Sequence, residues 1–251
     1  MDKWANKVVV VTGASSGIGY GIAKRLTKYG LQVIGLARRV ERIQKLASEL
    51  ANESGKLHPI KCDITNDNQV TEIFNNIKKQ FGGIDVLINN AGCVTKNETL
   101  LEGSMEVHRN LIETNILALT HCTQLAVKSM IERNIYGQVI NLNSIYGHII
   151  PIAKPIPNLY PASKFAVTAI SETLRQELYF LNNTKIKVAS LSPGYVDTEI
   201  VRTEEGEVNP FLADLEFLNV DDIVEGVVFI LSLPNHVQVN ELTLRHVGEK
   251  F

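Results

Sequence analysis

The sequence predicts an α/β fold in which one parallel sheet is covered by helices on both faces. Strand-length apolar runs alternate with segments of helical periodicity along almost the whole chain. A hydrophobic content of 45% in 251 residues is enough for a large core. No Pro-rich or Gly-rich linker divides the chain, so we expect a single domain over residues 1–251.

Seven segments have the apolar composition of buried strands, namely 7–11, 32–37, 57–61, 86–89, 138–142, 187–191 and 241–245. Helical spacing is found between them at 18–29, 40–54, 68–81, 105–134, 160–181 and 221–233. Pro234 ends the last of these helices. This order predicts a doubly wound, seven-stranded parallel sheet.

Two segments, 148–159 and 199–218, do not follow the alternation of strands and helices. Each comes after the end of a predicted strand, and open α/β sheets bind their ligands at the carboxyl ends of their strands. We therefore predict that both segments wall a substrate site. The alternative is that they are ordinary surface loops.

A glycine-rich turn follows the first predicted strand. It reads Thr12-Gly13-Ala14-Ser15-Ser16-Gly17-Ile18-Gly19, comes directly after four valines, and opens an amphipathic segment. The free amides and the dipole of a helix N-terminus favour anions, so this arrangement suits a diphosphate. The spacing is T-G-x-x-x-G-x-G rather than G-x-G-x-x-G. We predict a Rossmann-type dinucleotide site with contacts from Gly13, Ser15, Ser16, Gly17, Ile18 and Gly19, and an ordinary Gly/Ser loop is the alternative.

The second predicted strand ends in Leu36-Ala37-Arg38-Arg39. Folds that prefer NAD commonly carry an acidic residue here, which binds the adenosine ribose. This chain instead offers two guanidinium groups that can pair with a 2'-phosphate. The sequence therefore predicts NADP rather than NAD as cofactor, unless Arg38 and Arg39 only begin a solvated helix.

Tyr160 and Lys164 are spaced one helical turn apart, on the same helix face. A free tyrosine has a pKa of about 10, which is too high for proton exchange at neutral pH, and a nearby cation lowers it by about 1 to 3 units. The pair suits a general acid and base. Ser144 follows the predicted strand 138–142, at the sheet edge where ligands bind.

The composition excludes several other classes of function. Lys and Arg number 25 against 27 Asp and Glu, without a basic run, so we expect no nucleic-acid partner. No apolar run approaches the ~20 residues that span a bilayer. Cys62, Cys93 and Cys122 are widely spaced and lack metal-ligand spacing, so we expect no metal, reduced thiols and a cytoplasmic protein.

These motifs together resemble the short-chain dehydrogenase/reductase family, and the resemblance covers nearly the whole chain. Further motifs that carry it are Asp63 in Cys62-Asp63-Ile64, the run Asn89-Asn90-Ala91-Gly92, Asn115 in the long helix, and Pro193-Gly194-Tyr195-Val196-Asp197-Thr198. The resemblance implies an oxidoreductase of the EC 1.1.1 type that interconverts an alcohol and its carbonyl. One departure is that Asn143-Ser144 stands where the family often has two serines.

The resemblance also implies residue roles. Tyr160 exchanges a proton with the substrate oxygen, Lys164 lowers the pKa of Tyr160 and holds the nicotinamide ribose, and Ser144 binds the substrate oxygen. Asn115 anchors a water linked to Lys164, unless it is a buried asparagine that binds backbone.

Asp63 faces the adenine and Val196 and Thr198 hold the carboxamide. The implied cofactor contacts beyond the glycine turn are Arg38, Arg39, Asp63, Ile64, Asn89, Ala91, Gly92, Tyr160, Lys164, Pro193, Gly194, Val196 and Thr198.

The long segment between Ser144 and Tyr160 resembles a narrower branch of the family, which contains insect NADP-dependent farnesol dehydrogenases and vertebrate reductases of keto-steroids and other carbonyls. Leu174-Arg175-Gln176-Glu177-Leu178 supports the same resemblance. It implies oxidation of farnesol to farnesal, with a broad carbonyl or keto-steroid reductase as one alternative and a non-catalytic NADP-binding sensor as another. Candidate apolar pocket residues are Ile149, Ile150, Ile152, Ile156, Phe211, Leu212 and Phe217, and the alternative is that they pack under the loops. The long helices predicted at 105–134 and 160–181 resemble those that pair subunits in the family, which implies a homodimer or homotetramer.

Overall fold

The computed structural model describes residues 1–94, 98–150, 152, 158–202, 206–213 and 215–249. The described residues form one sheet of seven strands in the order β3-β2-β1-β4-β5-β6-β7, and every neighbouring pair is parallel. The strands are β1 (Val8–Thr12), β2 (Gln32–Ala37), β3 (Lys56–Lys61), β4 (Val86–Asn89), β5 (Gly137–Leu142), β6 (Ile186–Pro193) and β7 (Glu241–Leu244). The predicted seven-stranded parallel sheet is therefore confirmed.

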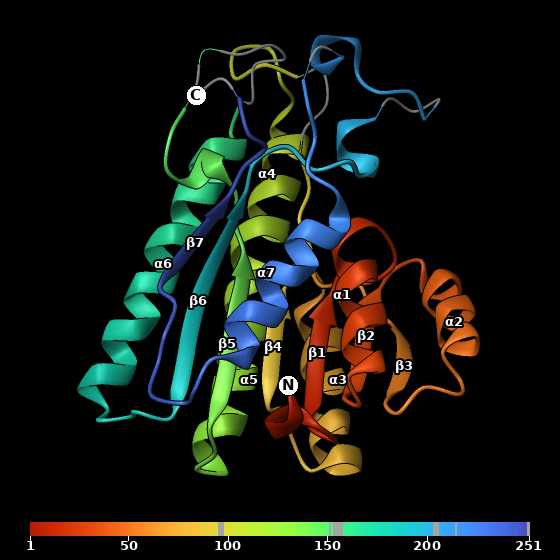
Figure 1. Cartoon of the computed structure of the whole chain (residues 1–251). Helices are drawn as coiled ribbons and strands as arrows, with labels where there is room; N and C mark the ends of the chain where they lie inside the picture. Colours follow the sequence, from red (N-terminus) through yellow and green to blue (C-terminus); the bar gives the residue numbers. More distant parts are fainter. Residues whose placement is uncertain (95–97, 151, 153–157, 203–205, 214, 250–251) are drawn as a thin grey trace.

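Helices follow the strands in the predicted alternation (Figure 1). The α-helices are α1 (Gly17–Lys28), α2 (Val40–Glu49), α3 (Asp67–Phe81), α4 (Met105–Ile112), α5 (Leu119–Glu132), α6 (Tyr160–Phe180) and α7 (Val220–Ser232). Shorter helical turns are η1 (Asp2–Trp4), η2 (Glu113–Ala118), η3 (Ile145–Gly147), η4 (Glu199–Val201) and η5 (Pro210–Leu212).

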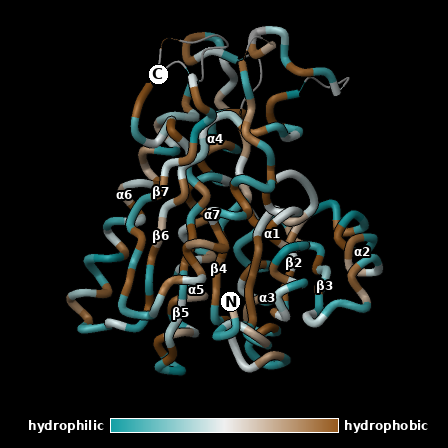
Figure 2. The backbone as a smooth tube through the Cα atoms, in the orientation of Figure 1, coloured by the Kyte–Doolittle hydropathy of each residue, from teal (hydrophilic) through white to brown (hydrophobic). Residues whose placement is uncertain are grey.

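The sheet separates two hydrophobic clusters, and β1 contributes to both. Val9 and Val11 pack into the cluster with α1, α2 and α7, whereas Val8 and Val10 pack into the cluster with α3, α5 and α6. This is the alternation expected of a strand buried on both faces. Figure 2 shows the apolar strands at the centre and polar residues toward the outside of the helices. The predicted double winding is confirmed.

Two predicted helices differ from the structure. The helix predicted at 105–134 is interrupted by one π-helical segment, η2, between α4 and α5. The helix predicted at 40–54 ends at Glu49 because the chain must turn back to β3. At that return Gly55 approaches the backbone so closely that a Cβ atom would lie 2.4 Å from the Leu31 oxygen.

The carboxyl ends of the strands meet at one edge of the sheet, and the order reverses between β1 and β4. This is the position at which doubly wound sheets bind ligands. The two predicted substrate walls begin at this edge, but residues 151, 153–157, 203–205 and 214 lie outside the described residues, and so do Ile156 and the side chain of Phe211. Within the described part of the chain, none of the helices combines the length and apolarity needed to cross a bilayer.

Candidate active site

The glycine turn after β1 forms a close-fitting cradle. Gly13 and Gly17 have φ angles of +69° and +53°, in the left-handed region that favours glycine. A Cβ atom on Gly13 would lie 2.9 Å from the Ala91 Cα, and one on Gly19 would lie 2.3 Å from the side-chain nitrogen Nδ2 of Asn90. The N-cap Ser16 makes no side-chain cap, and the first turn of α1 has no acidic residue. The amides at the start of α1 are thus available to an anion.

Thr12 and Asn90 join the ends of β1 and β4. Both belong to motifs predicted for the site, the turn 12–19 and the run 89–92, but their contacts with each other were not predicted. The Thr12 hydroxyl accepts hydrogen bonds from the amides of Asn90 and Ala91 at 3.1 and 3.0 Å. The Asn90 side chain donates to the carbonyls of Thr12 and Gly13 at 2.9 and 3.2 Å. Strand alternation was the available signal, because it places Asn89 and Asn90 on opposite faces.

A cavity of about 680 Å³ runs along this edge of the sheet. Its volume lies in the range of small-molecule and cofactor sites. The predicted site residues that line it are Gly13, Ser15, Ser16, Gly17, Ile18, Arg38, Arg39, Asp63, Ile64, Ala91, Gly92, Tyr160, Lys164, Pro193 and Thr198. Cys93 and Asn143 also line it and were not predicted. Glu199, the first residue of the predicted wall 199–218, lines it as well. The cradle and the cavity together fit a dinucleotide.

Four predicted cofactor residues are not part of this lining, namely Gly19, Asn89, Gly194 and Val196. Asn89 is 2% exposed, and its side-chain amide donates to Thr123 and Asn141 inside the protein. Val196 is buried beside Leu218, and Gly194 packs against Glu249. The predicted cofactor contacts of these four residues stay predictions.

The arginines after β2 lie at the other end of the cavity. Both are exposed, and the Arg39 Nη2 donates to the Ser16 hydroxyl at 2.9 Å. Burial alone would raise the pKa of Asp63, but hydrogen bonds from Thr65 and the charge of Arg38 outweigh it and hold this pKa below its ordinary value. Asp63 is therefore a carboxylate near the Arg38 guanidinium.

Tyr160, the first residue of α6, meets Ser144 from the end of β5. The Ser144 hydroxyl acts on the Tyr160 hydroxyl in the direction that lowers its pKa, and Ser144 accepts a hydrogen bond from the Tyr146 amide at 3.2 Å. Lys164 is buried and donates to the Leu142 carbonyl at 2.9 Å, with its Nζ 5.7 Å from the centroid of the Tyr160 ring. The structure thus brings the predicted serine, tyrosine and lysine together.

The pKa of Tyr160 corrects one expectation. We expected the Lys164 ammonium to lower it, but burial raises the pKa of Tyr160 to about 12, against the opposing effect of the Ser144 hydrogen bond. Burial also lowers the pKa of Lys164 to about 8. The ammonium is bonded to Leu142 rather than to the phenol oxygen. Tyr160 is consequently a phenol at neutral pH and can donate a proton.

Asn115 lies in the π-helical segment η2, 2% exposed. Its side-chain oxygen accepts from the Cys93 amide at 2.9 Å, and its nitrogen donates to the Cys93 carbonyl and the Ser163 hydroxyl, both at 3.0 Å. Ser163 in turn donates to the Tyr160 carbonyl at 2.7 Å. These bonds match the alternative of a buried asparagine that binds backbone, and they tie the loop after β4 to the start of α6.

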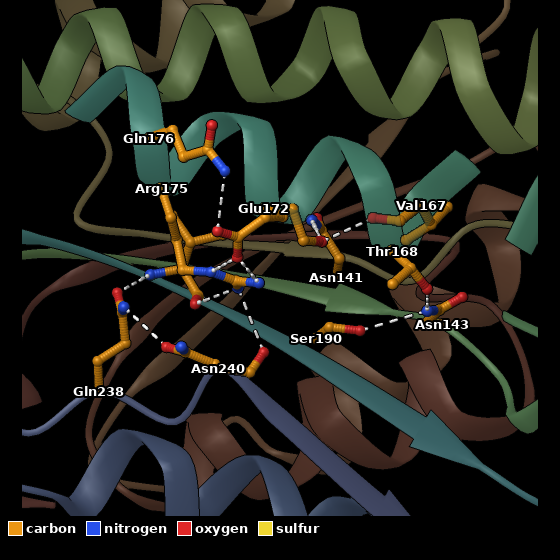
Figure 3. A network of polar contacts seen from close by, with 12 residues as sticks. Asn141, Asn143, Val167, Thr168, Glu172, Arg175, Gln176, Ser190, Gln238 and Asn240 are labelled. Atoms are coloured by element: carbon orange, nitrogen blue, oxygen red, sulfur yellow. Dashed lines mark hydrogen bonds and ion pairs between the residues drawn. The ribbon is translucent and has the colours of Figure 1, made fainter. Parts of the chain in front are cut away.

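A second asparagine, Asn143, holds together the elements around the site. The Asn143 side chain donates to the hydroxyls of Thr168 and Ser190 at 2.9 and 3.3 Å, and so joins β5 to α6 and β6 (Figure 3). Thr168 donates to the Gly147 carbonyl at 2.9 Å. This network fixes the backbone on both sides of Ser144.

An aromatic row extends from Tyr160 into the expected substrate region. The rings of Tyr160, Tyr146, Tyr195 and Phe217 follow one another at centroid distances of 5.9, 6.4 and 6.3 Å, each edge to face. The hydroxyls of Tyr146 and Tyr195 are hydrogen-bonded at 2.8 Å.

The three predicted lining isoleucines that the structure describes are turned away from the cavity. Ile149, Ile150 and Ile152 are 38%, 65% and 107% exposed, and none of them lines the cavity. Their apolar character alone did not reveal which way the loop turns. Leu212, by contrast, is buried.

Comparison with known proteins gives consistent matches over the whole chain. The family model described as short chain dehydrogenase matches residues 7–208. Farnesol dehydrogenase of Aedes aegypti is 46% identical over 253 residues, and the alignment covers 100% of this chain and 100% of that protein. Dehydrogenase/reductase SDR family member 11 of Mus musculus is 39% identical, with 98% of this chain and 96% of that protein covered.

A solved structure is similar as well. It is described as the closed form of serine dehydrogenase complexed with NADP+ and superimposes with a TM-score of 0.87 at 32% identity. The alignment covers 97% of this chain and 96% of that one.

Proposed function

The chain belongs to the short-chain dehydrogenase family, an oxidoreductase family that uses NAD or NADP, and from this we propose that it interconverts an apolar alcohol and its carbonyl with NADP. One observation carries the proposal. Tyr160, whose hydroxyl interacts with that of Ser144, lines the same cavity as the glycine turn, although Ser144 itself is not among the lining residues. A proton donor and a dinucleotide cradle therefore share one space.

The cofactor, when bound, supplies hydride transfer. The protein's own groups do the rest. Ser144 holds the substrate oxygen, and the Tyr160 hydroxyl gives it a proton in reduction or takes one in oxidation. Lys164 lines the same cavity and would hold the nicotinamide ribose.

The preference for NADP is supported by Arg38 and Arg39, which line the cavity directly after β2, a strand that ends without a carboxylate. An Arg39→Gln variant should lose at least about tenfold in affinity for NADPH and little for NADH, because a charge-assisted bond to the 2'-phosphate is removed. Lys45→Gln, an exposed cation on α2 outside the cavity lining, is the matched control. Equal affinity of the unmodified protein for both cofactors would refute the preference.

The apolar substrate is supported by the aromatic row beside Tyr160 and by the relative from Aedes aegypti, which is named for farnesol. The test is a substrate panel of isoprenoid alcohols, keto-steroids, small diketones and serine, assayed in both directions. We expect the highest kcat/KM with farnesol. A higher value with keto-steroids or diketones would favour a broad carbonyl reductase. Binding of NADPH without turnover of any compound would favour a sensor.

We further propose a homodimer or homotetramer. Apolar side chains are exposed along η2, α5 and α6, namely Leu117, Ile131, Phe165, Tyr179, Phe180 and Leu181. An exposed apolar face of this kind is typical of a subunit interface. Sedimentation that shows only monomer at micromolar concentration would contradict this.

A cytoplasmic location is also part of the proposal. Cys62 and Cys122 are buried free thiols, and burial raises the pKa of each to about 12, so neither is suited to disulfide exchange. Fractionation of cells that express the tagged chain tests the location directly.

A further inference from the structure

The carboxylate of Glu199 bridges two arginines that lie far away in the sequence. Glu199 is the first residue of η4, after β6, while Arg39 is the N-cap of α2 and Arg42 lies in its first turn. Arg39 Nη2 is 2.8 Å from one carboxylate oxygen, and Arg42 Nη1 is 2.5 Å from the other. Both carboxylate oxygens of Glu199 are thus paired with a guanidinium.

This bridge is built at the edge of the cofactor cavity. Ser16, Arg39 and Glu199 all line the cavity, and a single nitrogen of Arg39 contacts both the Ser16 hydroxyl and the Glu199 carboxylate. The hydrogen bond from Arg42, together with Arg39, holds the pKa of Glu199 below its ordinary value despite some burial. Glu199 is therefore negatively charged wherever the enzyme works.

A 2'-phosphate and a carboxylate bind the same group of Arg39. The carboxylate is planar and the phosphate tetrahedral, and both oxyanions prefer the paired N–H donors of a guanidinium. If Arg39 binds the 2'-phosphate, Glu199 faces a like charge and loses one of its two partners, and both effects weaken binding of the phosphate.

We propose that Glu199 is a specificity-determining residue that competes with the 2'-phosphate for Arg39 and so keeps the affinity for NADP below what the two arginines alone would give. The inference rests on the proposed use of NADP. Its consequence is faster release of the oxidised or reduced cofactor, because Glu199 re-forms its ion pair with Arg39 as the phosphate leaves. Arg42 keeps the carboxylate close to Arg39 in the meantime.

The opposite role for Glu199 makes an opposite prediction. If Glu199 served to orient Arg39 toward the phosphate, its removal would weaken binding. Competition instead requires that removal tighten it. The sign of the change therefore separates the two roles.

The experiment is calorimetric titration of the full chain with two fragments, adenosine 2',5'-bisphosphate and 5'-AMP, which differ only in the 2'-phosphate. Glu199→Gln should bind the bisphosphate about three- to tenfold more tightly, as expected for loss of exposed ion pairs, and 5'-AMP unchanged. Glu41→Gln is the matched control, because it removes an equal charge from the first turn of α2, outside the cavity lining. It should change neither affinity by more than about twofold.

The outcomes are distinct. Unchanged or weaker binding of the bisphosphate by Glu199→Gln would overturn the competition, and so would equal tightening by Glu41→Gln. If the unmodified chain bound the two fragments equally, the proposed preference for NADP would fail instead. Thermal unfolding of each variant verifies that the fold is intact.

Discussion

Lys164 directs its ammonium group to the main-chain oxygen of Leu142 at 2.9 Å, while it lies 5.7 Å from the centroid of the Tyr160 ring. The lysine is thus hydrogen-bonded to the end of β5, and its contact with the tyrosine is a cation–ring contact. Burial lowers its pKa to about 8, so the protein bears a cost for holding this charge at neutral pH.

That cost predicts a pH-dependent difference between the unmodified protein and Lys164→Met. The folded pKa of about 8 lies below the ordinary value of 10.5, so the unfolded chain binds more protons between these values. The free-energy cost of burying the charged Lys164 ammonium is complete below about pH 8 and is relieved as the pH rises toward 10.5. The free energy of unfolding of the unmodified protein should therefore rise relative to the variant over this interval, by on the order of 3 kcal/mol.

Denaturant titrations at several pH values measure this difference. Lys187, whose pKa burial also lowers to about 8, is present in both proteins and cancels. A difference that does not change with pH would show that Lys164 keeps an ordinary pKa.

Ser144→Ala should change both the rate and its pH dependence. The proposed role of the serine is to bind the substrate oxygen, and its hydroxyl also acts to lower the pKa of Tyr160. Without it the phenol becomes less acidic, so the rise of the oxidation rate with pH should move to higher pH. We expect a loss of about 10²-fold in kcat/KM, as for other single hydrogen-bond donors in active sites.

The control for this prediction is Ser171→Ala on α6, the helix that begins with Tyr160. Ser171 is buried and bonded to Asn141 and Val167, away from the cavity lining. It should lower stability but leave the pH profile in place. The same displaced profile in both variants would argue that Ser144 acts only through the fold.

Asn115→Ala should destabilise the protein by about 2 to 3 kcal/mol, because it leaves the amide and carbonyl of Cys93 without their side-chain partner near the protein interior. Urea titration measures this, with the exposed Asn52→Ala as control. If stability were unchanged while activity fell, the role of Asn115 would be in proton transfer rather than in holding the site together.

The sheet and the glycine turn follow from local patterns in the sequence. The alternation of Val8 to Val11 between the two clusters is a property of any buried strand. The left-handed angles at Gly13 and Gly17 are open to few other residues, so the turn was predictable too. Tyr160 and Lys164 meet because helical spacing brings them together.

Contacts between distant segments were not predictable in this way. Glu199 and Arg39 are 160 positions apart, and nothing near either residue indicates the other. The exposed isoleucines of the loop after η3 have the composition of a pocket wall but turn outward, since their orientation depends on tertiary packing. The raised pKa of Tyr160 likewise depends on burial, which local spacing does not contain.

The proposed mechanism assigns proton transfer to the Tyr160 hydroxyl, and the kinetics of Tyr160→Phe test this assignment. Phenylalanine keeps the ring that packs 5.9 Å from Tyr146 and removes only the hydroxyl, on which Ser144 acts. Tyr146→Phe is the matched control, because its hydroxyl bonds Tyr195 instead. We predict that Tyr160→Phe binds NADPH within about twofold of the unmodified protein but loses about 10²- to 10⁴-fold in kcat. Turnover by Tyr160→Phe close to that of Tyr146→Phe would contradict the assignment.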